Sequence, residues 1–147
     1  MPGRKAITKM MDDKYKLLEK EIKNILGEIE HYSLTTDCWT DTHKTESYIS
    51  LTVHFWNPWT NELDSFQIGA FPLNKNHTAD YLGKELRTLC ELWNIRDDRI
   101  ICIVTDNAPN IVKAVKDEFG AKKHVRCFAH TLNLFAEDSI KEGPGKI

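Results

Sequence analysis

Apolar side chains recur at helical spacing near the start of the chain. Between residues 8 and 29 they fall at alternating intervals of four and three residues, and charged residues fill most of the other positions. This pattern predicts an amphipathic helix whose apolar positions are Met11, Tyr15, Leu18, Ile22, Ile25 and Ile29. Its narrow stripe suits either a coiled coil or packing on the domain, and because about three heptads are marginal for independent pairing we expect packing.

The periodicity changes to strand-like alternation after residue 31. The first alternating segment is predicted to end near Asp37, and residues 48–56 then alternate with one apolar face. Residues 57–61 (NPWTN) are typical of a turn, and residues 63–71 alternate again. These three segments predict an antiparallel meander.

Helices and strands alternate in the second half of the chain. Leucines at helical spacing lead up to Trp93, and Thr78 can serve as the N-cap of their helix. The apolar run 100–104 is typical of a central strand buried on both faces. In the helix that follows, Asn107 can cap the start and Gly120 can form the end.

A short strand around residues 125–128 and a last helix complete the predicted elements. The order is helix, three strands, helix, strand, helix, strand, helix. It predicts an α/β fold with a mixed sheet of three antiparallel strands followed by two parallel strands, covered by helices on both faces. A crossover helix after the third strand can bring the fourth strand beside the first, parallel to it.

Composition narrows the class of protein. The chain has 147 residues, of which 41% are hydrophobic and 29% charged, which is typical of one soluble globular domain. We assign residues 1–30 to an N-terminal helical segment packed on the core, 31–142 to the domain, and 143–147 to a tail. The net charge of −2 lacks the positive excess of a dedicated nucleic-acid binder.

Cysteine usage and the N-terminal sequence bear on the compartment. The four cysteines are scattered without CxxC pairs, which favours a reducing compartment over a disulfide framework. The N-terminus lacks an apolar signal core, and no stretch approaches the roughly 20 apolar residues that span a bilayer. We therefore expect an intracellular, soluble protein with no membrane partner.

Two aspartates follow predicted strands that can be parallel neighbours. Asp37 and Asp106 would then emerge about 5 Å apart, the spacing between adjacent strands. Carboxylates so close repel each other, and a divalent cation such as Mg²⁺ or Mn²⁺ relieves the repulsion. The alternative is that both are ordinary strand-end aspartates that solvate turns or cap helices.

Six segments together resemble the hAT transposase superfamily and its domesticated relatives with BED-type zinc fingers. No single segment is specific, but their order over most of the chain is. They are LTTDCWTD at 34–41, YISLTVHFW at 48–56, NHTAD at 76–80, ELWNI at 91–95, IVTDNAPNIVKAV at 103–115 and CFAHTLNL at 127–134.

The resemblance implies an RNase H-like fold with a three-carboxylate site that cuts and joins DNA using two metal ions. Asp37 matches the first acidic residue and Asp106 the second. The third, a glutamate, lies in the family beyond a helical insertion that follows the CxxH segment, and Glu137 and Asp138 come too early to match it. We therefore expect DNA as partner, a nuclear location and no complete strand transfer by this chain alone. A full-length homologous protein is a second expected partner, and a non-enzymatic interaction or regulatory module is the alternative function.

Three further residues are candidate neighbours of the site. Cys127 and His130 form the CxxH element, which either borders the active site or supplies a small core residue and a turn cap. Their spacing matches half a zinc site, but no second pair is suitably placed, so we expect no structural zinc. Trp39 either packs under the site or stacks on a base.

Overall fold

The computed structural model describes residues 3–41, 43 and 46–142. The tail expected at 143–147 lies outside these residues. The elements follow the predicted order, with short 3₁₀ turns at Asp97–Arg99 and Ala121–Lys123. They are α1 (Arg4–Glu28), β1 (Tyr32–Asp41), β2 (Glu46–Asn57), β3 (Glu62–Leu73), α2 (Ala79–Leu92), β4 (Ile100–Thr105), α3 (Pro109–Phe119), β5 (His124–Arg126) and α4 (Phe128–Glu142). None of the described helices is long and apolar enough to cross a membrane.

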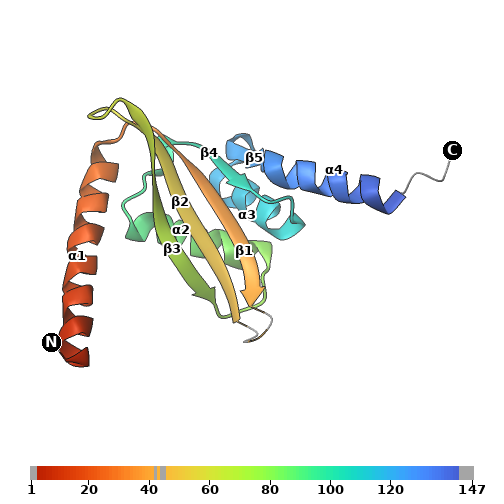
Figure 1. Ribbon diagram of the computed structural model, residues 1–147. Helices are drawn as coiled ribbons and strands as arrows, with labels where there is room; N and C mark the ends of the chain where they lie inside the picture. The colour runs from red at the N-terminus through yellow and green to blue at the C-terminus, as the bar shows by residue number, and fades with distance from the viewer. Residues whose placement is uncertain (1–2, 42, 44–45, 143–147) are drawn as a thin grey trace.

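The five strands form one mixed sheet in the order β3-β2-β1-β4-β5 (Figure 1). The first three strands pair antiparallel, and β1–β4 and β4–β5 pair parallel. This is the predicted RNase H-like arrangement, and it is confirmed. It places β1 in the centre, with β2 on one side and β4 on the other.

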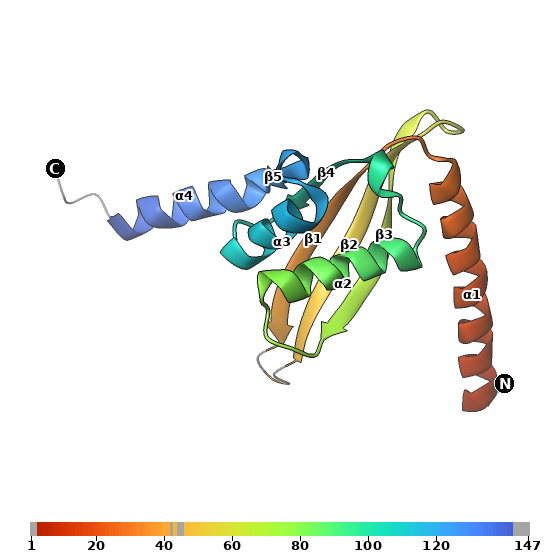
Figure 2. The ribbon, with the colours of Figure 1, turned by 180° about the vertical axis from the view of Figure 1, so that it is seen from behind.

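Both crossover helices cover the same face of the sheet. Figure 2 shows α2 and α3 side by side in front of the strands, whereas α1 and α4 extend away from the sheet. We expected helices on both faces, and in this detail the structure differs. The cause is handedness: the β3-to-β4 and β4-to-β5 connections join parallel strands and advance in the same direction, so two right-handed crossovers must lie on one side.

The core lies between this covered face and the two helices. Alternate residues of the central strands point into it, among them Leu34 of β1 and Leu51 of β2, and both are fully buried. Their neighbours Thr35 and Thr52 point to the opposite face and are only half-buried. The sheet thus has an apolar covered face and a polar open face.

Helix α1 packs only through its last two turns. Leu26 is fully buried, and Ile22 and Ile25 pack partly against the core. Arg99 secures this end by donating from Nη1 to the carbonyl oxygens of Gly27, at 2.8 Å, and Ile29, at 2.6 Å. The apolar stripe expected to pack on the core is exposed further toward the N-terminus, at Met11, Tyr15 and Leu18.

Strand β1 continues beyond its predicted end. Asp37 was expected near the carboxyl end of the strand, but β1 runs to Asp41 because the long strand β2 supplies paired residues as far as Glu46. Pairing with β4 ends earlier, at Thr35 and Val104. Asp37 therefore lies just past the end of the parallel pairing, although within β1 itself.

Replacement of Tyr32 by Phe should reduce the fall in the free energy of unfolding as the pH becomes alkaline. Burial raises the pKa of Tyr32 from 10.0 to about 12, although its hydroxyl oxygen accepts a hydrogen bond from the Arg96 N–H, which favours the phenolate. A phenol with a raised pKa stabilises the fold fully below pH 10, and this contribution is lost as the pH rises toward about 12. Urea unfolding at pH 8, 10 and about 11 should show a smaller fall for Tyr32→Phe than for the parent; equal falls would contradict the assignment.

Candidate functional site

Asp37 and Asp106 meet on the open face of the sheet. The parallel register pairs Thr35 with Val104. Asp37 and Asp106 each come two residues after these partners, so continuing the register brings the two aspartates opposite each other. Side chains alternate between faces, which puts both carboxylates on the face that α2 and α3 leave open.

One pocket gathers four of the five predicted site residues. Its volume is about 430 Å³, and it opens at the end of the β1–β4 pairing. The lining consists of Thr35, Thr36, Asp37, Ser50, Val104, Thr105, Asp106, Cys127 and His130. The structure thus brings Asp37, Asp106, Cys127 and His130 together, whereas Trp39 lies outside the pocket.

The pKa of the Cys38 thiol is affected by both carboxylates. Burial, together with the negative charges of Asp37 and Asp106, raises the pKa of this thiol from 9.0 to about 12. The two carboxylates give this region a negative electrostatic potential, which attracts a cation.

Backbone hydrogen bonds hold each carboxylate in place. Asp37 Oδ1 accepts from the Cys38 N–H at 2.8 Å, and Asp106 Oδ1 accepts from the Ala108 N–H at 3.1 Å. Each bond engages one oxygen, and a carboxylate has a second oxygen that can bind a cation. Each carboxylate is therefore held in place through Oδ1, while its Oδ2 remains able to bind a ligand.

Asn107 does not cap α3, contrary to the expectation. Ala108 occupies the N-cap position, and Asn107 Nδ2 instead donates to Thr131 Oγ1 of α4 at 3.1 Å. The start of α4 is also held by the Cys127 N–H, which donates to the Thr105 carbonyl at 2.8 Å. These two bonds tie α4 to the end of β4 and so place His130 over Asp106's pocket.

Trp39 forms an exposed aromatic platform beside the pocket. Its ring stacks on Tyr48, with 5.7 Å between centroids and 24° between planes, and 42% of the residue remains exposed. Trp39 is two residues beyond Asp37, so it lies on the same open face. The ring of Trp39 both packs on Tyr48 and stays accessible to solvent. It is therefore compatible with a packing role and with stacking on a base.

Ser50 is a site residue that the sequence did not reveal. It pairs directly with Asp37 in the β1–β2 ladder, and its carbonyl accepts from Thr36 Oγ1 at 2.7 Å. The alternation of β2 shows that Ser50 faces away from the core, but only the register places it beside Asp37. That register was not readable from the sequence pattern alone.

The donor set suits a hard divalent cation. Two carboxylates supply oxygen ligands of the kind that Mg²⁺ and Mn²⁺ prefer. Among the residues that the structure describes, no group of three or more His, Cys, Asp and Glu side chains is arranged to hold a metal ion. A metal ion held by Asp37 and Asp106 alone would need a further ligand or water molecules to complete its coordination shell.

Residues 35–130 match the family model described as the ZBED1 RNase-like domain. The chain belongs to this family. The matched range begins in the middle of β1 and ends at His130, so the whole candidate site lies inside the RNase-like domain.

Curated relatives of the RNase-like domain include both transposases and BED-type proteins. The chain is 29% identical to "Putative AC transposase" of Zea mays over 153 residues, covering 93% of the chain and 18% of that protein. It is 27% identical over 147 residues to "Zinc finger BED domain-containing protein 4" of Homo sapiens (95% and 12%) and 30% identical over 149 residues to the human "Zinc finger BED domain-containing protein 6" (94% and 15%). The resemblance based on the six segments is confirmed, and the chain spans less than a fifth of each of these proteins.

Proposed function

We propose that this RNase-like domain binds a divalent metal ion through Asp37 and Asp106 and acts on the phosphodiester backbone of DNA as part of a transposase-type site. The observation that carries the proposal is the meeting of the two aspartates in one pocket at the end of parallel strands. Similarity to a protein named as a transposase supports it. A nuclear location follows from DNA as the partner.

In this proposal each residue of the site has a separate role in binding. Asp37 and Asp106 hold the cation, and Mg²⁺ or Mn²⁺ bound there would polarise a phosphoryl oxygen and activate water. His130, near the start of α4, donates a hydrogen bond to a phosphate oxygen, and Cys127 lines the pocket beside it. Trp39 stacks on a base next to the phosphate.

This chain alone is expected not to complete DNA cleavage or strand transfer. Two-metal phosphoryl transfer requires more ligands than two carboxylates provide, and the described residues contain no three-ligand cluster. A full-length homologous protein is a partner that would supply the remaining group. The domain's own part is then to bind metal and DNA.

A non-enzymatic interaction module is the alternative function. Its support is the exposed apolar surface of α4, where Phe128, Phe135 and Ile140 are each more than 70% exposed. Apolar side chains gathered on one exposed helix are typical of a protein contact. In that case the fold serves as a scaffold and the aspartates bind no metal.

Calorimetric titration with MnCl₂ separates the two functions. The parent chain should bind Mn²⁺ weakly, with a dissociation constant of about 0.1–1 mM, as expected of an oxygen site with few charged ligands. Asp37→Asn and Asp106→Asn should each weaken binding about tenfold or more, because each removes one of two anionic ligands.

Asp12→Asn is the matched control. Asp12 is exposed on α1, so its loss changes the net charge equally without touching the pocket. Binding should be unchanged in this variant. Absence of heat in the parent, or an equal loss in all three variants, would rule out the metal site and favour the interaction module.

A further inference from the structure

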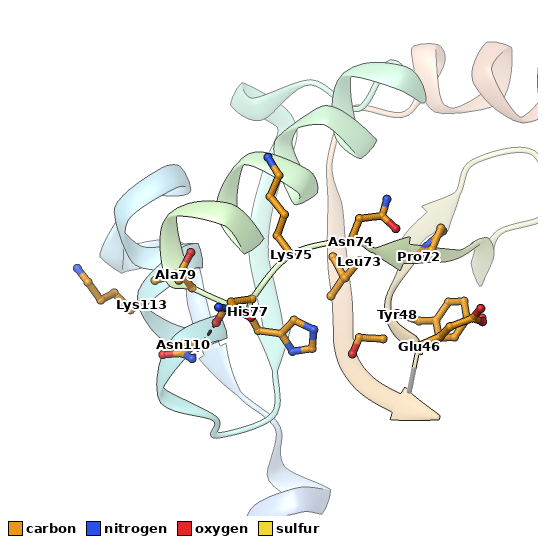
Figure 3. Close-up of a pocket in the computed structure, with 13 residues that line it drawn as sticks. Glu46, Tyr48, Pro72, Leu73, Asn74, Lys75, His77, Ala79, Asn110 and Lys113 are labelled. Atoms are coloured by element: carbon orange, nitrogen blue, oxygen red, sulfur yellow. Dashed lines mark hydrogen bonds between the residues drawn. The ribbon is translucent and has the colours of Figure 1, made fainter. Parts of the chain in front are cut away.

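A second and larger hollow lies at the end of the sheet, next to the candidate site. Its volume is about 1220 Å³. Figure 3 shows its two sides: Asn110 and Lys113 lie on the helical side, and Glu46 and Tyr48 lie on the strand side. The segment between β3 and α2 crosses between them. We call this hollow the end groove.

The end groove is lined mainly by hydrogen-bond donors. Its polar lining contains two lysines, a histidine, three asparagines and three hydroxyl residues, against a single carboxylate, Glu46. Glu46 accepts a hydrogen bond from Tyr48 Oη at 2.6 Å, which offsets part of its charge. The donors are Lys75, His77, Lys113, Asn74, Asn76, Asn110, Ser47 and Thr78. Such a surface attracts anionic oxygen atoms, although the chain as a whole has a net charge of −2.

Tertiary hydrogen bonds hold the crossing segment in shape. Asn110 Nδ2 of α3 donates to the His77 carbonyl at 2.8 Å, shown as a dashed line in Figure 3. At the other end, the Asn74 N–H donates to Tyr81 Oη of α2 at 3.1 Å. The groove is therefore preformed, which lowers the entropic cost of binding a ligand.

The two lysines of the groove are free to turn toward a ligand. Lys113 Nζ forms a 2.6 Å ion pair with Asp117, but both side chains are more than 60% exposed, so the pair contributes little and exchanges readily. Lys75 Nζ lies 5.6 Å above the Tyr81 ring, also at the surface. A phosphate in the groove would compete well for both ammonium groups.

The end groove and the aspartate pocket both border strand β2. Ser50 lines the pocket, whereas Tyr48 and Glu46 of the same strand and face line the groove, so about 14 Å of β2 connects the two. Tyr48 also stacks on Trp39, which makes the connecting surface aromatic. On the other side, α3 begins at Pro109, three residues after Asp106, and its residues Asn110 and Lys113 line the groove.

We propose that the end groove binds the phosphate backbone of a DNA strand that continues from the aspartate pocket across Trp39 and Tyr48. This proposal rests on the proposed function for its choice of DNA. Anionic oxygens suit the lysine and asparagine donors, and bases suit the stacked rings, so one polymer satisfies both surfaces. A span of about 14 Å corresponds to roughly four nucleotide steps at a rise of about 3.4 Å.

The test is the salt dependence of DNA binding in EDTA, measured by fluorescence anisotropy with a labelled single-stranded oligonucleotide. The double variant K75A/K113A should lower affinity about tenfold at low salt. It should also reduce the slope of log affinity against log salt by about 1.4, because each lost phosphate contact removes about 0.7. Asn76→Asp, which adds a negative charge at an exposed position with little change of shape, should also weaken binding.

Lys5 and Lys9 supply the matched control, because both are exposed on α1 and remote from the groove. K5A/K9A changes the net charge equally and should leave affinity within about twofold. Equal losses in the two double variants, an unchanged slope in K75A/K113A, or no DNA binding by the parent would overturn the proposal. Since EDTA removes divalent ions, the result is independent of the calorimetric test of Asp37 and Asp106, and either proposal can fail alone.

Discussion

Leu34→Ala is expected to lower the free energy of unfolding by about 2–5 kcal/mol, as large-to-small changes in a packed core do. Leu34 is fully buried in the central strand and faces the core beneath α2 and α3. The truncation leaves a cavity between β1 and the helices. Urea unfolding followed by circular dichroism measures the change.

Thr35→Ala is the control from the next position of the same strand. Thr35 points to the open face, where its hydroxyl lies 3.0 Å from His54 Nε2. Loss of one part-buried hydrogen bond should cost about 0.5–1.5 kcal/mol. Equal effects of the two substitutions would show that the faces of β1 are not divided as described.

Gly83 permits the close approach of α2 and α3, and its replacement by Leu should destabilise the protein by about 1–3 kcal/mol through overpacking. A Cβ atom at this position would lie 3.4 Å from both the Ala114 carbonyl oxygen and Glu118 Cβ. A larger side chain must push the helices apart. It would also strain the Arg87 side chain, whose Nε donates to Glu118 Oε1 and whose guanidinium lies 4.6 Å above the Phe119 ring.

Gly83→Ala should behave in the opposite way. A single methyl group fits at ordinary contact distance, and alanine favours a helix over glycine by up to about 1 kcal/mol. We therefore expect unchanged or slightly higher stability by thermal unfolding. A loss as large as that of Gly83→Leu would mean that the two helices tolerate no Cβ atom at all at this position.

The central strand couples these stability effects to the proposed function. One face of β1 contributes Leu34 to the core, and two residues of the other face, Asp37 and Trp39, belong to the candidate site or its border. A shift of β1 by a single residue would exchange the faces. The core side chains therefore also determine where the carboxylate of Asp37 points.

Much of the candidate site could be predicted because its residues follow recognisable elements. The apolar run of β4 ends at Asp106, and the CxxH segment that contains Cys127 and His130 begins the last helix. Ser50 was missed because its role depends on which residue of β2 pairs with Asp37. The end groove was missed for the same reason, since its donors come from segments that are distant in sequence.

The sequence by itself determined the number, order and type of the elements, because hydrophobic periodicity reflects local backbone geometry, and it indicated Asp37 and Asp106 as candidate site residues. Tertiary structure alone decided that α2 and α3 share one face, that β1 extends to Asp41, and that most of α1 is exposed. These features depend on crossover handedness, strand register and the surface available for packing. Such properties arise between elements, and no periodicity within one element encodes them.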